Sequence, residues 1–100
     1  MIEGMLKKEK RTRGRRSKKE TWFLYLLKCA DGSLYTGITN DLDRRLQMHQ
    51  NGKASRYTRA RRPVNMVYHE KCKSRARALV RECMVKTFSK KKKLELAETR

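Results

Sequence analysis

The sequence has few acidic residues and no long apolar run. Its 100 residues include 10 Asp or Glu against 28 Lys or Arg, which gives a formal net charge of +18. The longest uninterrupted apolar stretch, 22–27, is far shorter than the roughly 20 residues of a membrane-spanning helix. No apolar segment follows the basic N-terminus, as a secretory signal would require. We therefore expect neither a membrane span nor export.

Cysteine is also scarce. Cys29, Cys72 and Cys83 are odd in number, lie far apart and form no CxxC pair, which argues against both a disulfide framework and a structural zinc site. Free thiols are typical of a reducing compartment, so the sequence predicts a cytoplasmic protein. Because Cys29 and Cys83 have apolar neighbours, we expect both thiols to be buried as small hydrophobic groups.

The positive charge is spread over the whole chain. Residues 1–20 have a net charge of +6 and residues 21–100 a net charge of +12. The first segment has only isolated apolar residues without a helix or strand period, which predicts a disordered basic tail ahead of one folded domain, 21–100. Charge of this size favours a polyanion partner, nucleic acid first, although a merely solvated basic surface would have the same composition.

Turn and cap signals divide the folded part into short elements. The Asp31–Gly32 pair between two apolar runs predicts an antiparallel hairpin. Thr39 or Asn40 is expected to cap the first helix, and Gly52 to end it. The predicted elements are strands at 22–27 and 34–38, a helix at 41–50, a strand at 64–68, a helix from 74 to about 88, and a helix at 89–98. This order, β-β-α-β-α-α, predicts an α+β domain with a small three-stranded antiparallel sheet and two or three helices.

The second predicted helix has a broad apolar face, which we expect to dock on the sheet. The face consists of Leu79, Val80, Cys83, Met84 and Val85.

Two triplets lie on the two strands of the predicted hairpin: Phe-Leu-Tyr at 23–25 and Tyr-Thr-Gly at 35–37. With these triplets, followed by Asn-Asp-Leu-Asp-Arg-Arg-Leu at 40–46 and by Arg81-Glu82, the sequence resembles the GIY-YIG nuclease family. The resemblance covers about residues 21–95 and is greatest to small stand-alone bacterial members. It extends to 57–59, 62–63 and the strand at 67–70.

The resemblance implies a metal ligand and a phosphate ligand. Glu82 would hold a divalent cation, Mg²⁺ or another such as Mn²⁺, because hard cations tolerate a single carboxylate with water and phosphate as further ligands. Arg45 stands eight positions after Gly37 and matches the family's arginine, whose guanidinium fork suits phosphate. Its neighbour Arg44 would face solvent or the DNA backbone, and Gly37 would allow a close backbone approach.

The resemblance also implies two tyrosines at the reacting centre. Tyr25 and Tyr35 would position or deprotonate the attacking water, although a phenol with an ordinary pKa near 10 is a poor base. His49 lies one helical turn after Arg45, and some family members place a histidine there near the reacting water. With an ordinary pKa near 6.5, His49 is a chemically easier base.

Structural roles for the same residues remain open from the residues alone. Tyr25 and Tyr35 would serve equally as a cross-strand packing pair. Glu82 would form a surface pair with Lys86 at the i,i+4 spacing. Arg45 would be a solvated helix residue, and His49 a half-buried one.

Two positions depart from patterns within the family. In some members a lysine follows the glycine of the second triplet, and others have an asparagine twelve positions after the glutamate. This chain has Ile38 and Leu94 there, so neither side chain can assist at the site.

A basic loop at 53–63 predicts phosphate contact without base readout, with Tyr57 either stacking on a base or anchoring the loop. The expected nucleic-acid-binding residues are Lys53, Arg56, Tyr57, Arg59, Arg61 and Arg62.

Together these features favour a metal-dependent endonuclease that nicks or cleaves DNA, branched or nicked DNA included, with DNA repair or processing as its role. The alternatives are a non-catalytic nucleic-acid-binding module on the same fold and a basic protein associated with RNA or the ribosome.

Overall fold

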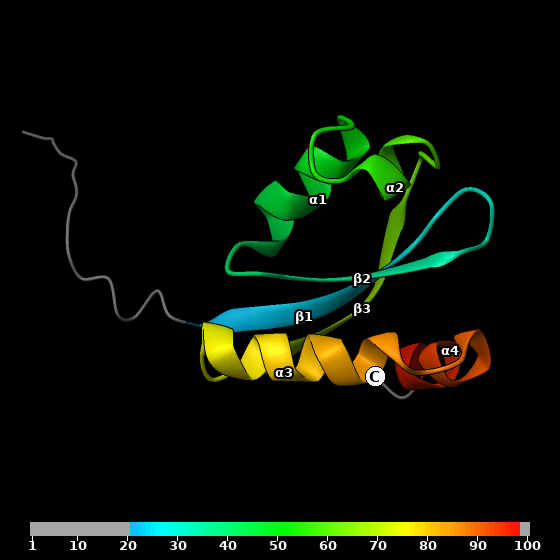
Figure 1. The fold of residues 1–100 in the computed structure, drawn as a ribbon. Helices are drawn as coiled ribbons and strands as arrows, with labels where there is room; N and C mark the ends of the chain where they lie inside the picture. The colour runs from blue at the N-terminus through cyan, green and yellow to red at the C-terminus, as the bar shows by residue number, and fades with distance from the viewer. Residues whose placement is uncertain (1–20, 99–100) are drawn as a thin grey trace, which may run out of the picture.

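The computed structural model describes residues 21–98, so the predicted tail at 1–20 lies outside the described residues. The elements are β1 (Trp22–Lys28), β2 (Leu34–Thr39), α1 (Leu42–Gln50), α2 (Arg56–Arg59), β3 (Asn65–Cys72), α3 (Arg75–Lys86) and α4 (Lys90–Glu98) (Figure 1). The predicted α+β class is confirmed. Within the described part of the chain, no helix is long and apolar enough to cross a membrane.

The sheet has the strand order β2-β1-β3, and both pairs are antiparallel. The predicted hairpin turn is present: Asp31 accepts hydrogen bonds from the backbone and hydroxyl of Ser33, and Gly32 has a positive φ of 87°. In this register, Tyr25 on the central strand lies opposite Gly37 on β2 and His69 on β3. The first triplet is therefore at the middle of the sheet.

Helices cover both faces of the sheet, α1 and α2 on one side, α3 and α4 on the other (Figure 1). Because strand side chains alternate, β1 contributes to two cores. Leu24 and Leu26 pack with Tyr68 and Val85, against Leu96 and Ala97 of α4. The other core, on the side of α1, consists of Tyr25, Leu27, Cys29 and Val64, with Tyr35, Leu42, Leu46 and Met66 packed against them.

Residues 21–98 contain four helices, one more than the sequence predicted. The additional helix, α2, lies in the segment expected to be a loop, and it forms because the Ser55 side chain accepts a hydrogen bond from the Thr58 backbone N–H. The cap of α1 also differs from the prediction, since Asp41 rather than Thr39 or Asn40 accepts from the Arg44 N–H. The third strand continues to Cys72, four residues beyond its expected end.

The predicted docking face of α3 is wrong, because most of its residues point away from the sheet. Val85 is buried as expected, but Leu79, Val80 and Met84 are exposed, Val80 with 64% of its surface. Cys83 is exposed as well, whereas Cys29 is buried as predicted. The helix docks through Ala78 and Val85 and through an ion pair of Arg81 with Glu70 on β3. The side of α3 that faces the sheet is therefore the stripe of Ala78, Arg81, Glu82 and Val85, which includes two charged residues that a search for apolar positions passes over.

Candidate active site

The hydroxyl end of Tyr25 lies over Gly37, its partner on the neighbouring strand. A Cβ atom added at Gly37 would stand 2.5 Å from the Tyr25 hydroxyl oxygen and 2.6 Å from Cζ, closer than non-bonded atoms approach. The glycine of the second triplet therefore provides the space that the tyrosine of the first triplet occupies. Tyr25 is 2% exposed, so its ring is part of the core while its hydroxyl needs a partner.

His49 is that partner. Its Nε2 atom lies 2.8 Å from the Tyr25 hydroxyl, and its Nδ1 atom lies 2.7 Å from the Thr58 hydroxyl. The imidazole is 1% exposed, although it belongs to the last turn of a surface helix. The structure thus uses both ring nitrogens of His49 to join β1 to α2.

The short helix α2 brings Thr58 to this position. The Ser55 hydroxyl accepts from the Thr58 N–H at 3.1 Å and lies 2.9 Å from the Thr58 hydroxyl. Thr58 is completely buried. Sequence reasoning missed both residues as part of the site; the signal that could have found them is Ser55, a favoured N-cap residue whose hydroxyl accepts from the N–H two or three positions on.

Tyr35, the tyrosine of the second triplet, joins the same cluster through its ring. Its centroid is 5.1 Å from that of His49 and 6.4 Å from that of Tyr25. The Tyr57 ring stacks on Tyr35 at 6.0 Å, and the Arg61 guanidinium lies 3.8 Å from the centre of Tyr57. Tyr57 is therefore already in contact with protein groups, as the anchoring alternative predicted, and it supports Tyr35.

Arg45 also faces the cluster, whereas Arg44 is exposed. The Nε atom of Arg45 is buried and has no hydrogen-bond partner among residues 21–98. A buried guanidinium nitrogen without an acceptor is costly, so this position favours the binding of an anion. The positive charge of Arg45 acts on both Tyr25 and His49, which places it beside the hydrogen-bonded pair.

Burial sets the protonation states of Tyr25 and His49. Removal from water raises the pKa of Tyr25 well above its ordinary value, the nearby Tyr35 and Glu82 raise it further, and Arg45 lowers it. Burial, assisted by the charge of Arg45, lowers the pKa of His49 from 6.5 to about 4. At neutral pH the resting site therefore contains a neutral phenol bonded to a neutral imidazole.

Glu82 approaches from α3, which lies on the other side of the sheet from α1 (Figure 1). Its side chain is 19% exposed and pairs with Lys86 at 3.4 Å, so the surface pair that the spacing allowed is present. Its charge nevertheless acts on Tyr25. Among the described residues no three His, Cys, Asp or Glu side chains gather as metal ligands. The Glu82 carboxylate is a hard oxygen donor, and one carboxylate completed by water and phosphate suits a Mg²⁺ ion.

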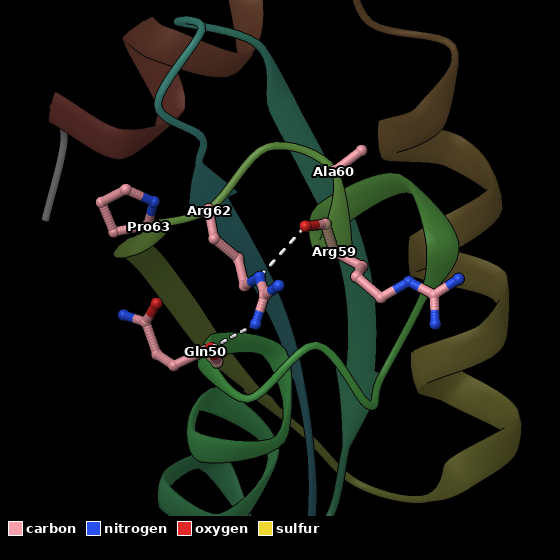
Figure 2. Close-up of a pocket in the computed structure, with 5 residues that line it drawn as sticks. All are labelled: Gln50, Arg59, Ala60, Arg62 and Pro63. Carbon is pink, nitrogen blue, oxygen red and sulfur yellow. Dashed lines mark hydrogen bonds between the residues drawn. The ribbon is translucent and has the colours of Figure 1, made fainter.

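The predicted nucleic-acid-binding residues divide into two groups. Arg61 pairs with Asp31 at 3.0 Å, and Arg62 donates to the backbone carbonyls of Arg59 and Gln50 (Figure 2). These two arginines hold the segment in place. The side chains of Lys53, Arg56 and Arg59 are exposed and make no hydrogen bond or ion pair with any other residue in 21–98.

Two open pockets adjoin the free basic side chains, and Arg59 lines both. One has a volume of about 380 Å³ and is lined by Gln50, Arg59, Ala60, Arg62 and Pro63 (Figure 2). The other has a volume of about 440 Å³ and is lined by Gly52, Lys53, Ala54, Ser55, Arg56 and Arg59.

The structure thus brings Tyr25, Tyr35, Arg45 and His49 together and leaves Glu82 on a separate helix. Ile38, at the position of the missing lysine, is a half-buried residue of β2, opposite Leu24. Leu94, at the position of the missing asparagine, is half-buried on α4. Neither side chain has a polar group to offer the site.

Comparison with known proteins gives one consistent family. The model of the GIY-YIG catalytic domain matches residues 21–95. A UPF0213 protein of Bacillus pumilus (strain SAFR-032) is 52% identical over 75 residues, which cover 75% of this chain and 76% of that protein. A UPF0213 protein of Staphylococcus saprophyticus is 49% identical over 74 residues, covering 74% of this chain and 90% of that one.

Two solution NMR structures are similar to the chain. A UPF0213 protein from Bacillus halodurans has a TM-score of 0.52 at 40% identity, and a protein from E. faecalis has a TM-score of 0.56 at 35% identity. Each match covers 80% of this chain and 85% of the other.

Proposed function

Because the chain belongs to the GIY-YIG catalytic-domain family, we propose that it is an endonuclease that hydrolyses DNA phosphodiester bonds with the help of a divalent cation. One observation carries the proposal: the buried Tyr25–His49 hydrogen bond lies beside Arg45, whose Nε has no partner among the described residues. A proton acceptor, a hydroxyl and an unsatisfied cation are the groups that phosphodiester hydrolysis requires.

Arg45 is the group that would bind the scissile phosphate. Its guanidinium is held at the buried cluster by α1, and a phosphate oxygen would give its Nε the acceptor that it lacks. The negative charge on the phosphate oxygens grows as water attacks. A guanidinium already in place stabilises that charge without reorganisation.

Tyr25 and His49 would remove the proton from the attacking water. Tyr25 would accept a proton from water while its own hydroxyl proton moves to His49 Nε2, which leaves hydroxide, an intact phenol and an imidazolium. His49 acts through Tyr25 because both its ring nitrogens are engaged, Nε2 with Tyr25 and Nδ1 with Thr58. Tyr35, which is less buried and in ring contact with His49, would orient the phosphate or the water.

Glu82 would hold the divalent cation, Mg²⁺ or Mn²⁺. When bound, such an ion polarises the phosphate and offsets charge on the leaving oxygen. Lys86 now neutralises the Glu82 carboxylate, so Lys86 would have to move aside. Since the pair is partly exposed, its separation costs about 1 kcal/mol or less.

Lys53, Arg56 and Arg59 would hold the DNA backbone. They are the free cations of the predicted basic loop, and their pocket extends from the end of α1 to α2. Each phosphate that they neutralise releases counterions, so affinity would fall steeply with salt and would not depend on sequence. Bacterial DNA lies in the cytoplasm, the location that the free thiols also favour.

Cleavage of supercoiled plasmid tests the proposal. The full chain with Mg²⁺ should convert supercoiled plasmid to the nicked form, and EDTA should stop the reaction. Glu82→Gln should lose the activity, while Glu95→Gln, a change of an exposed glutamate on α4, should retain it. Equal nicking by the wild type and Glu82→Gln would indicate a contaminating nuclease and refute the proposal.

A non-catalytic nucleic-acid-binding module is the second candidate. The raised pKa of Tyr25 and the Glu82–Lys86 pair favour it, because both describe a stable, closed cluster. This function predicts tight, salt-sensitive DNA binding that EDTA does not alter, and no cleavage of duplex, single-stranded, flapped or branched DNA.

A further inference from the structure

The four-residue chain Tyr25–His49–Thr58–Ser55 is continuous, and three of its four members are buried. The joining distances are 2.8 Å, 2.7 Å and 2.9 Å in that order. Tyr25 and His49 belong to the proposed site by family resemblance. The part contributed by α2, Thr58 and Ser55, has no place in that assignment.

The direction of the hydrogen bonds follows from the donors available. Within residues 21–98 the Tyr25 hydroxyl has His49 as its hydrogen-bond partner and no other. If His49 Nε2 carried the proton, the buried Tyr25 O–H would point at no acceptor, which is unfavourable. Tyr25 therefore donates to Nε2, and a neutral imidazole then carries its proton on Nδ1. That Nδ1–H donates to the Thr58 hydroxyl.

The Thr58 hydroxyl can accept the hydrogen bond from Nδ1–H because its own O–H donates to Ser55. The Thr58 hydroxyl lies 2.9 Å from the Ser55 hydroxyl and 3.5 Å from the Ser55 carbonyl oxygen, both of which can accept. The Ser55 hydroxyl also fixes the Thr58 backbone by accepting its N–H. The capping geometry of α2 thus sets the orientation of the hydroxyl that faces His49.

We infer that Thr58 is a positioning residue of the proposed nuclease: its hydroxyl holds His49 in the Nδ1–H tautomer, so that Nε2 is the acceptor for the Tyr25 proton. The role of Thr58 in catalysis rests on the proposed function. The tautomer itself is a property of the resting protein. Ser55 also lines the basic pocket with Lys53, Arg56 and Arg59, so DNA anchoring and His49 orientation depend on the same short segment.

The substitution Thr58→Val keeps the size of the side chain and removes the acceptor, and Thr58→Ser keeps the hydroxyl. In Thr58→Val the buried Nδ1–H loses its partner, so we expect His49 to change tautomer or turn away from Tyr25. The plasmid-nicking rate should then fall by at least about tenfold with little change in DNA affinity, as when the partner of a metal-bound histidine is removed. Thr58→Ser should stay within about threefold of the wild type, because the hydrogen bond is retained.

A nitrogen NMR spectrum of the full chain, labelled on histidine and free of metal and DNA, reads the tautomer directly. His69→Gln identifies the signals of the other histidine. The inference expects a protonated Nδ1 and an unprotonated Nε2 at His49 in the wild type and Thr58→Ser, and a changed pattern in Thr58→Val. A wild-type His49 protonated at Nε2 overturns it, and this measurement does not require Thr58→Val to fold.

The proposed nuclease function and the positioning role of Thr58 can be refuted independently of each other. If the wild type cleaves DNA and Thr58→Val has the wild-type tautomer and rate, the positioning role is refuted and the nuclease stands. If no DNA is cleaved but the Nδ1–H tautomer depends on the Thr58 hydroxyl, the proposed function fails and the positioning of His49 is supported.

Discussion

The Tyr25 hydroxyl oxygen and Nε2 of His49 are hydrogen-bonded at 2.8 Å, across the interface between the central strand and α1. The two residues are 24 positions apart, and both are almost completely buried. A buried polar pair of this kind orders the core around it, because either partner alone would be unsatisfied. In this protein the same pair carries the proposed proton transfer.

Folding stability should depend on pH through His49. Its folded-state pKa, about 4, lies below the ordinary 6.5, so the unfolded chain binds a proton that the folded chain does not. The contribution of His49 to the free energy of unfolding is therefore fully present above about pH 6.5, and it is lost as the pH falls toward 4. The groups around the ring are Tyr25, Tyr35, Thr58 and Arg45, and the positive charge of Arg45 acts in the same direction as burial.

Urea unfolding of the wild type and His49→Gln at several pH values measures this dependence. The difference in the free energy of unfolding between the two proteins should shrink by roughly 2–4 kcal/mol from pH 7 to pH 4. Parallel pH profiles for the two proteins would show that His49 does not titrate in this window.

Arg45 and Arg44 provide a matched pair on one helix. Arg45→Ala should reduce the plasmid-nicking rate by about a hundredfold or more, since removal of one donor to a developing charge has that effect in other enzymes. Arg44→Ala should change the rate little, because Arg44 is exposed and outside the cluster. Equal losses in both variants would indicate that only general charge matters.

Gly37→Ala should displace Tyr25. The added Cβ would meet the Tyr25 hydroxyl oxygen at 2.5 Å and Cζ at 2.6 Å, and crowding of a packed core costs about 1–3 kcal/mol. Thermal unfolding should show the loss, and the nicking rate should fall with it. A variant as stable as the wild type would mean that the strand and the ring adjust without cost.

The basic residues near α2 should separate into binding and structural groups. Arg56→Ala and Arg59→Ala should each lower DNA affinity and reduce the salt slope by about one, because each removes one phosphate contact. Their stability should stay within about 0.5 kcal/mol of the wild type. Arg62→Ala should instead cost about 1 kcal/mol or more of stability, since it removes two bonds to backbone carbonyls. Salt-dependent binding and urea unfolding of the three variants distinguish these effects.

The sequence predicted the sheet and most of the helices because their signals are local. The Asp31–Gly32 turn fixes the hairpin, and Ser74 caps α3 through the Arg77 N–H. The helix α2 escaped prediction because four residues are too few to show a period. The outward orientation of Val80 also escaped it, because the docking face depends on tertiary contacts such as the Arg81–Glu70 ion pair.

In the candidate site, too, the features with a local sequence signal were predictable and those that depend on tertiary packing were not. The family resemblance predicted that Tyr25, Tyr35, Arg45 and His49 would lie together, which they do. It also placed Glu82 with them, whereas Glu82 lies on α3 and pairs with Lys86. The hydrogen bond from His49 to Thr58 was not predictable, because it depends on where α2 packs. The commitment of Arg61 and Arg62 to structural contacts has the same cause, since their partners come from the β1–β2 turn, α1 and α2.

The most direct test of the account compares Mg²⁺-dependent nicking of supercoiled plasmid by the wild type and Tyr25→Phe. Phenylalanine retains the buried ring and removes the hydroxyl that bonds His49. We expect the wild type to nick the plasmid and Tyr25→Phe to be slower by about a hundredfold or more. A wild type without activity, or a Tyr25→Phe variant that nicks at the wild-type rate, would contradict the account.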